Sequence, residues 1–158
     1  MKALIVYDSY FGNTEKIVGA IARALESQLE ITSIHACEVK MEQLSGLDFL
    51  LVGSPTRGFR PSEATTAFLK KIPAGALNGI KVVAFDTRVS AEDIKNPFLT
   101  FLTGLFGYAA SPIAKQLSQK GGQLVATPEG FFVKESIGPL KDGELERAAS
   151  WASSLIKG

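Results

Sequence analysis

The stretch KALIVYDSYFGNTEK, residues 2–16, passes from a short apolar run through a small polar loop into a helical pattern. Leu4, Ile5 and Val6 are consecutive apolar residues, which favours a strand buried on both faces of a parallel sheet. Beyond the loop, apolar residues recur at helical spacing at Ile17, Ile21, Leu25 and Leu29. The stretch therefore predicts a strand, a tight loop and a helix in direct succession.

The loop between this strand and this helix has the features of a phosphate site. The first turn of a helix carries unpaired backbone N–H groups and a partial positive charge, and Ser9 and Thr14 add hydroxyl donors. Gly12 permits close approach of the main chain to an anion. No Lys follows this glycine as in a P-loop, and the dinucleotide motif needs three glycines. We therefore expect a phosphomonoester here; the alternative is an ordinary turn capped by a hydroxyl.

Composition excludes several classes of protein. A length of 158 residues predicts one domain, 1–158, with a single core. With 17 basic and 16 acidic residues, the chain has no charge excess for binding nucleic acid, and one Cys and one His argue against disulfide frameworks and common metal sites. The longest apolar stretch, 97–110, is too short to span a membrane, and the N-terminus lacks a signal pattern, so we expect a cytoplasmic protein.

Strand and helix patterns alternate to the end of the chain. Further strands are predicted over residues 30–39, 48–53, 80–85 and 123–126, and helices begin at Ser62, at Ser111-Pro112 and at Asp142. The helices after Ser62 and Asp142 are expected to bury Ala64, Ala67, Phe68 and Ile72, and Leu145, Ala149, Ala152 and Ile156. This order predicts an α/β fold, a three-layer, doubly wound, five-stranded parallel sheet that binds ligands at the carboxyl ends of its strands.

Three segments meet at that edge, residues 8–14, 54–61 and 86–90, and there the chain resembles the flavodoxin family. SYFGNTEK is similar to the family's loop for the FMN phosphate, and GSPTRGF is similar to its second loop. The resemblance implies an FMN cofactor whose phosphate is held by Ser9, Tyr10, Phe11, Gly12, Asn13 and Thr14. It further implies an isoalloxazine ring edged by Pro55, Thr56, Arg57, Gly58 and Phe59 and by Asp86, Thr87 and Arg88.

The chain also departs from the family pattern. Phe11 stands where a third hydroxyl is usual, Arg57 stands near the usual aromatic flank, and the segment DTRVS, 86–90, contains no tyrosine to stack on the ring. The near-neutral charge does not support an acidic surface that steers basic partners. Arg57, Arg60 and Arg88 are predicted to cluster on loops, either as exposed solubilising residues or close to the flavin or an anionic substrate.

An apolar insertion follows the fourth strand. Asn96-Pro97 is typical of a helix start, so a short helix is predicted over residues 97–106. Its apolar residues cover nearly the whole circumference and leave a narrow stripe of small residues at Thr100, Thr103 and Gly104. They are Phe98, Leu99, Phe101, Leu102, Leu105 and Phe106. The helix could add to the core, cover the flavin as a lid, or contact a second copy, a partner or a membrane surface.

Three functions follow from this pattern. The leading hypothesis is an FMN-binding electron-transfer protein that serves a redox partner protein or a small-molecule acceptor, in which the flavin carries the redox chemistry and no side chain is catalytic. The alternative is an FMN-dependent oxidoreductase acting on a quinone or porphyrinogen-like substrate. A flavin-free binding module is the third hypothesis.

Overall fold

The computed structural model describes residues 1–90 and 93–157, apart from the side chains of Leu105 and Phe106. A parallel sheet with strand order β2-β1-β3-β4-β5 forms its centre, and β6 also pairs with β4. The strands are β1 (Lys2–Tyr7), β2 (Glu30–His35), β3 (Phe49–Pro55), β4 (Lys81–Val89), β5 (Gln123–Leu124) and β6 (Glu129–Val133).

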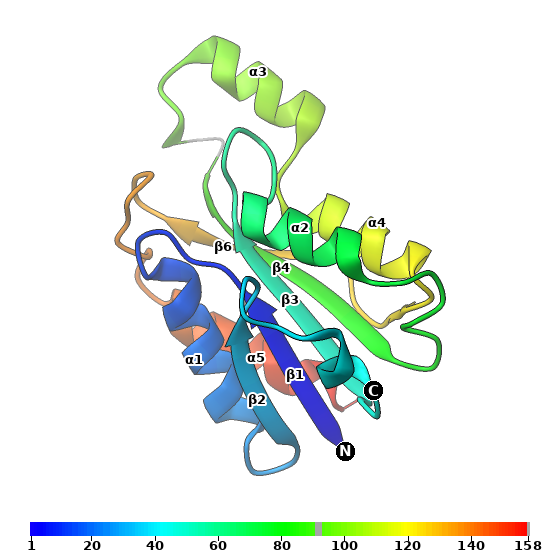
Figure 1. Cartoon of the computed structure of the whole chain (residues 1–158). Coiled ribbons are helices and arrows are strands. Elements are labelled where there is room, and N and C mark those ends of the chain that lie inside the picture. Colours follow the sequence, from blue (N-terminus) through cyan, green and yellow to red (C-terminus); the bar gives the residue numbers. More distant parts are fainter. Residues whose placement is uncertain (91–92, 158) are drawn as a thin grey trace.

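Helices cover both faces of this sheet (Figure 1). They are α1 (Asn13–Leu25), the 3-10 helix η1 (Met41–Leu44), α2 (Glu63–Lys71), α3 (Pro97–Phe106), α4 (Ala110–Gln119) and α5 (Glu144–Leu155). Helices α1 and α5 pack on one face, and α2 and α4 pack on the other. The predicted three-layer, doubly wound arrangement is confirmed. None of the described helices is long and apolar enough to cross a bilayer.

The central strands are buried on both faces, as their continuous apolar runs predict. Along β1 and β3, Ile5 and Leu51 face α1 and α5, whereas Val6 and Val52 face α2 and α4. All four side chains have no solvent exposure. The two hydrophobic clusters thus share one sheet, which holds the carboxyl ends of β1, β3 and β4 at a common edge.

The fifth strand is divided, which the sequence analysis did not predict. β5 is only two residues long and pairs with Lys81 and Val82, and β6 pairs with residues 85–89 of the same strand. The strand β6 was not recognised in the sequence because Gly130 interrupts its strand pattern. The glycine is required in the fold: a Cβ at Gly130 would come within 2.4 Å of three atoms of the Arg88 guanidinium group.

Two of the predicted helix starts differ from those in the structure. Ser62 caps α2 as predicted, since its hydroxyl accepts a hydrogen bond from the Thr65 N–H. Helix α4, however, begins at Ala110, so Ser111 is not its cap. The N–H groups of Ala109 and Ala110 instead donate hydrogen bonds to Thr56 Oγ1, just after β3, and to Asp86 Oδ2 of β4. Helix α5 begins at Glu144 after Gly143, two residues beyond the predicted Asp142.

Some inward faces also differ from the prediction. Ala67 of α2 is exposed, and Leu145 of α5 is 37% exposed, while Ala149 and Ile156 are half-buried and Ala152 is buried. The cause in α5 is Glu144, which is buried because its carboxylate accepts hydrogen bonds from the Phe132 N–H at 2.7 Å and from the Arg147 guanidinium. A paired carboxylate therefore replaces the apolar residue that the periodicity predicted.

The apolar insertion forms a helix but does not join the core. The Asn96 side chain accepts hydrogen bonds from the N–H groups of Phe98 and Leu99, so the predicted start of α3 is confirmed. Phe98 and Phe101 are each 65% exposed, and Figure 1 shows α3 beyond the carboxyl edge of the strands. The core alternative is therefore wrong for these residues. The side chains of Leu105 and Phe106 lie outside the described residues, as do Ala91 and Glu92.

The environment of Glu144 makes a prediction about pH. Burial raises its pKa, but the hydrogen bonds from Arg147 and the Phe132 N–H outweigh burial and leave the pKa below its ordinary value of 4.5. A lowered pKa stabilises the fold above that value, and the stabilisation is lost as the pH falls. We expect Glu144→Gln to lower the free energy of unfolding by about 1–3 kcal/mol at neutral pH.

Urea unfolding at several pH values tests this expectation. The difference between wild type and Glu144→Gln should shrink below about pH 4. Glu146→Gln, an exposed change on the same helix, serves as the control and should have little effect. A difference that stays constant across this range would contradict the assignment.

Candidate functional site

A cavity of about 400 Å³ lies at the carboxyl edge of the sheet. Eleven of the fourteen predicted site residues line it: Ser9, Tyr10, Phe11, Asn13, Thr14, Pro55, Thr56, Arg57, Gly58, Thr87 and Arg88. Gly12, Phe59 and Asp86 are not among its lining residues. Val89, Val133 and Ser136 also line the cavity and were missed, the last two because β6 was not predicted.

The loop after β1 leaves the N-terminus of α1 open. Gly12 is the N-cap residue, has a φ of 86° and provides no side-chain cap. Its N–H donates to Ser9 Oγ at 3.1 Å, which folds the loop on itself. The N–H groups of Asn13 and Thr14 lie in the first helical turn, where no intrahelical acceptor exists. These donors, with the helix dipole, suit a phosphate group.

Two hydrogen bonds join this loop to distant segments. Thr14 Oγ1 and Thr87 Oγ1 lie 2.9 Å apart in a buried contact between α1 and β4. Asn13 Nδ2 donates to the Ile137 carbonyl at 3.2 Å, so the Asn13 side chain holds the loop after β6. The cavity is thus closed by segments that are far apart in the sequence.

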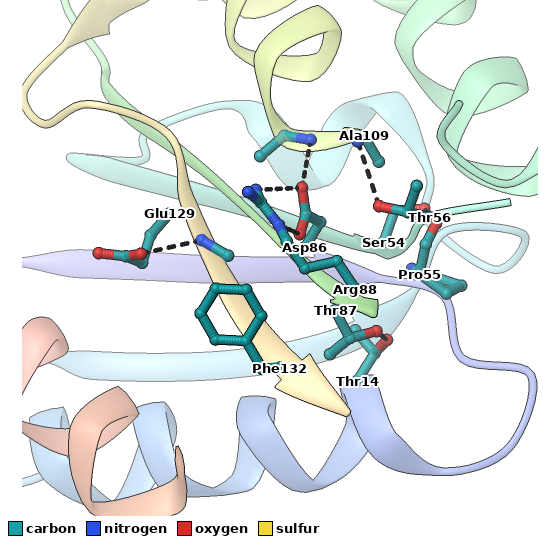
Figure 2. Close-up of polar contacts among 12 residues, drawn as sticks. Thr14, Ser54, Pro55, Thr56, Asp86, Thr87, Arg88, Ala109, Glu129 and Phe132 are labelled. Carbon is teal, nitrogen blue, oxygen red and sulfur yellow. Dashed lines mark hydrogen bonds and ion pairs between the residues drawn. The ribbon is translucent and has the colours of Figure 1, made fainter. Parts of the chain in front are cut away.

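The predicted third loop, 86–90, is corrected: β4 continues to Val89 because β6 pairs with residues 85–89. Asp86 is completely buried and forms a bidentate ion pair with Arg88 (Figure 2). The Arg88 Nε and Nη2 atoms lie 2.6 and 2.7 Å from the two carboxylate oxygens. Asp86 Oδ2 also accepts from the Ala110 N–H at 2.8 Å. Burial raises the pKa of Asp86, and the bonds from Arg88 and Ala110 oppose this rise. Asp86 therefore binds both the Arg88 side chain and the first turn of α4.

The arginines have different surroundings. The Arg88 guanidinium stacks on the Tyr108 ring at 3.9 Å, and its charge is balanced by Asp86. Arg57 lies over the rings of Tyr10 and Phe11, at 4.9 and 5.6 Å from their centroids. These half-exposed rings belong to the first loop. Tyr10 thus brings to the cavity an aromatic side chain that the segment 86–90 lacks.

The comparison with known proteins agrees with this geometry. The model of the flavodoxin domain matches residues 4–135 of the chain. A curated relative, "Probable flavodoxin 1" of Bacillus subtilis (strain 168), is 36% identical over 159 residues, which cover 99% of this chain and 95% of the relative. The chain belongs to the flavodoxin family. It is an FMN-binding electron-transfer protein, as predicted.

Solved flavodoxin structures have the same fold. Oxidised flavodoxin 2 from Bacillus cereus superposes with a TM-score of 0.80 at 23% identity, covering 99% of each chain. Oxidised flavodoxin 1 from the same organism has a TM-score of 0.78 at 20% identity, covering 99% of this chain and 98% of its own. Membership of the flavodoxin family implies redox partner proteins.

The lining of the cavity fits FMN. The open N-terminus of α1 has neutral donors and a glycine whose Cβ position has no atom within 4 Å, which leaves room for a phosphate. Tyr10, Pro55 and Val89 present ring and apolar surfaces of the kind that an isoalloxazine needs. Donors and apolar surface thus occur together in one cavity.

The buried Asp86–Arg88 pair generates the second prediction. Arg88→Gln leaves a fully buried carboxylate without its partner, so the free energy of unfolding should fall by about 3–5 kcal/mol. Adding Asp86→Asn should restore most of the loss, because Asn keeps an acceptor for the Ala110 N–H.

Urea unfolding of the single and double variants measures this coupling. The deficit of Arg88→Gln should also decrease at acidic pH, since a raised pKa means that protonating Asp86 favours the folded state. Arg23→Gln, a change at an exposed arginine of α1, should have little effect. A double variant as unstable as Arg88→Gln would show that the pair is not coupled.

Proposed function

We propose that the chain carries electrons with FMN bound so that its phosphate lies in the loop Ser9–Thr14. The observation that supports this assignment is the uncapped N-terminus of α1, which opens into the cavity at the carboxyl edge of β1, β3 and β4. The isoalloxazine would lie along residues 55–58 and 87–89, the two other sides of the same cavity.

The chain's own residues bind and orient the cofactor. When bound, FMN supplies the redox chemistry, and the protein supplies position and electrostatics. Ser9 accepts the Gly12 N–H and keeps a hydroxyl proton to donate to the phosphate. The Thr14–Thr87 bond fixes the phosphate loop against β4, and the Arg57–Tyr10 stack fixes the mouth of the cavity. These contacts connect the three segments that line the cavity.

We propose a carrier rather than an enzyme. The curated relative is a probable flavodoxin, and a bound flavin transfers electrons without a catalytic side chain. We therefore assign the redox chemistry to the flavin alone. We also propose that residues 1–158 act as one domain. We further propose that the protein is cytoplasmic, which suits its free, exposed Cys37.

Two glycines provide a matched test of the phosphate loop. Gly12 and Gly46 both have positive φ, 86° and 75°, and neither would place a Cβ within 4 Å of another atom. Alanine should therefore strain both positions by about 1–2 kcal/mol through the backbone. This strain comes from the positive φ and not from contact between the new Cβ and other protein atoms.

Only Gly12→Ala should weaken FMN binding, because only Gly12 belongs to the proposed phosphate loop, between the lining residues Phe11 and Asn13. Fluorescence quenching of FMN measures the dissociation constant for each variant, and we expect a rise of about tenfold or more for Gly12→Ala. Gly46→Ala should bind FMN like wild type. Equal FMN affinity in both variants would contradict the phosphate assignment.

The exposed face of α3 is assigned to protein contact. Phe98, Leu99 and Phe101 expose apolar surface beyond the edge of the sheet that contains the cofactor cavity. We propose that this face contacts a redox partner protein, since it lies beyond the edge of the sheet at which the cavity is found. The lid hypothesis makes a different prediction, because removing a lid exposes the flavin.

Phe98→Ser/Phe101→Ser separates these roles. A contact face for a redox partner predicts unchanged iodide quenching of bound flavin, together with slower electron transfer to a redox partner protein. Loss of a dimer in analytical ultracentrifugation would identify a second copy of the chain as the occupant instead. Leu145→Ser, which removes an exposed apolar residue of α5, is the control. Increased quenching in the α3 variant alone would identify a lid instead.

A further inference from the structure

A second cavity lies beside the cofactor cavity. It has a volume of about 500 Å³ and is bounded by the end of the loop after β3, by α2 and by α4. Gly58 lines both cavities, so they share one loop as a wall. The volume is within the range of about 300–1,000 Å³ that is usual for small-molecule sites.

The lining of this second cavity combines apolar surface with two cationic side chains. Phe59, Pro61, Leu69 and Pro112 supply apolar surface, and Arg60 and Lys70 supply two positive charges. In the part of the chain that the structure describes, the lining includes no Asp or Glu. Gln116 and Thr66 add neutral hydrogen-bonding groups. A ligand with a flat apolar body and an anionic group matches this distribution.

The loop that bounds the second cavity is held in an uncommon conformation. Phe59 has a φ of 67°, the only positive value among the described residues other than glycine. Arg57 and Arg60 exchange backbone hydrogen bonds at 2.8 and 3.0 Å, and Ser54 Oγ accepts from the Ser62 N–H at 2.9 Å. These hydrogen bonds fix the conformation of the loop and keep Phe59 in the wall of the cavity. Strain of this kind, about 1–3 kcal/mol, is concentrated at ligand sites.

We propose that this cavity binds a planar aromatic anion, a fused-ring carboxylate or sulfonate, with its rings against Phe59 and Leu69 and its charge between Arg60 and Lys70. The site is separate from that of FMN, because only Gly58 is common to the two linings. Ligand binding here does not depend on the assignment of the phosphate loop. It would place a small organic anion directly beside the wall of the flavin cavity.

The test uses the FMN-loaded protein and anilinonaphthalene sulfonate as the probe. Isothermal titration calorimetry should detect one site on wild type. Arg60→Gln/Lys70→Gln should weaken binding of the sulfonate by about tenfold, and added salt should reduce the difference. The same double variant should bind phenylnaphthylamine, a neutral probe of similar shape, like wild type.

Filling the cavity with a larger side chain provides an independent test. Thr66→Phe should abolish binding of both probes and leave the dissociation constant of FMN unchanged, since Thr66 lines only the second cavity. Lys71→Gln, an exposed charge change on the same helix that does not touch the cavity, should alter neither probe.

Three results would overturn the proposal. They are an absence of sulfonate binding to wild type, sulfonate binding that is unchanged in Arg60→Gln/Lys70→Gln, or binding that survives Thr66→Phe. In the last case, a loss of binding in Phe98→Ser/Phe101→Ser would move the site to α3. Circular dichroism should confirm that each variant is folded. If Thr66→Phe fails to fold, Gln116→Trp fills the cavity from α4 and replaces it in the same comparison.

Discussion

The unpaired amide groups in the first turn of α1 are the constraint on which the site depends. Parallel pairing of β1 with β3, and of β3 with β4, brings the carboxyl ends of these strands to one edge, and α1 starts there without a side-chain cap. The loop is shaped by its own contacts: Ser9 binds the Gly12 N–H, and Thr14 binds Thr87. The donors that remain suit an anion, and we propose that this anion is the phosphate of FMN.

A second set of contacts links the cavity to the opposite face of the sheet. Asp86 is buried under Arg88 and also binds the Ala110 N–H, while Thr56 binds the Ala109 N–H (Figure 2). The start of α4 is therefore held by Thr56, which follows β3 and lines the cavity, and by Asp86 of β4. The charge of Arg88 is balanced by Asp86, whereas Arg57 lies exposed over Tyr10 and Phe11.

The parts of the fold that sequence predicts are those determined locally. Ile5 and Val52 belong to uninterrupted apolar runs, and Ser62 and Asn96 are side-chain caps, so each element was evident without tertiary information. The errors arose where a distant contact replaces the local signal. Gly130 obscured β6 because its role is to make room for Arg88, and Asp86 was placed on a loop because the pairing that extends β4 comes from β6. In the site, the first loop was predictable from its helix start, whereas Val133 and Ser136 depend on a strand about 120 residues later.

We propose that the loop Ser9–Thr14 recognises the phosphate of the cofactor, and a paired titration measures this recognition. Apoprotein should be titrated with FMN and with riboflavin, which differ only by the phosphate, while flavin fluorescence quenching is followed. Because at least two charge-assisted hydrogen bonds are lost with the phosphate, we predict that riboflavin binds about 100-fold more weakly or worse. Equal affinities for FMN and riboflavin would contradict the account.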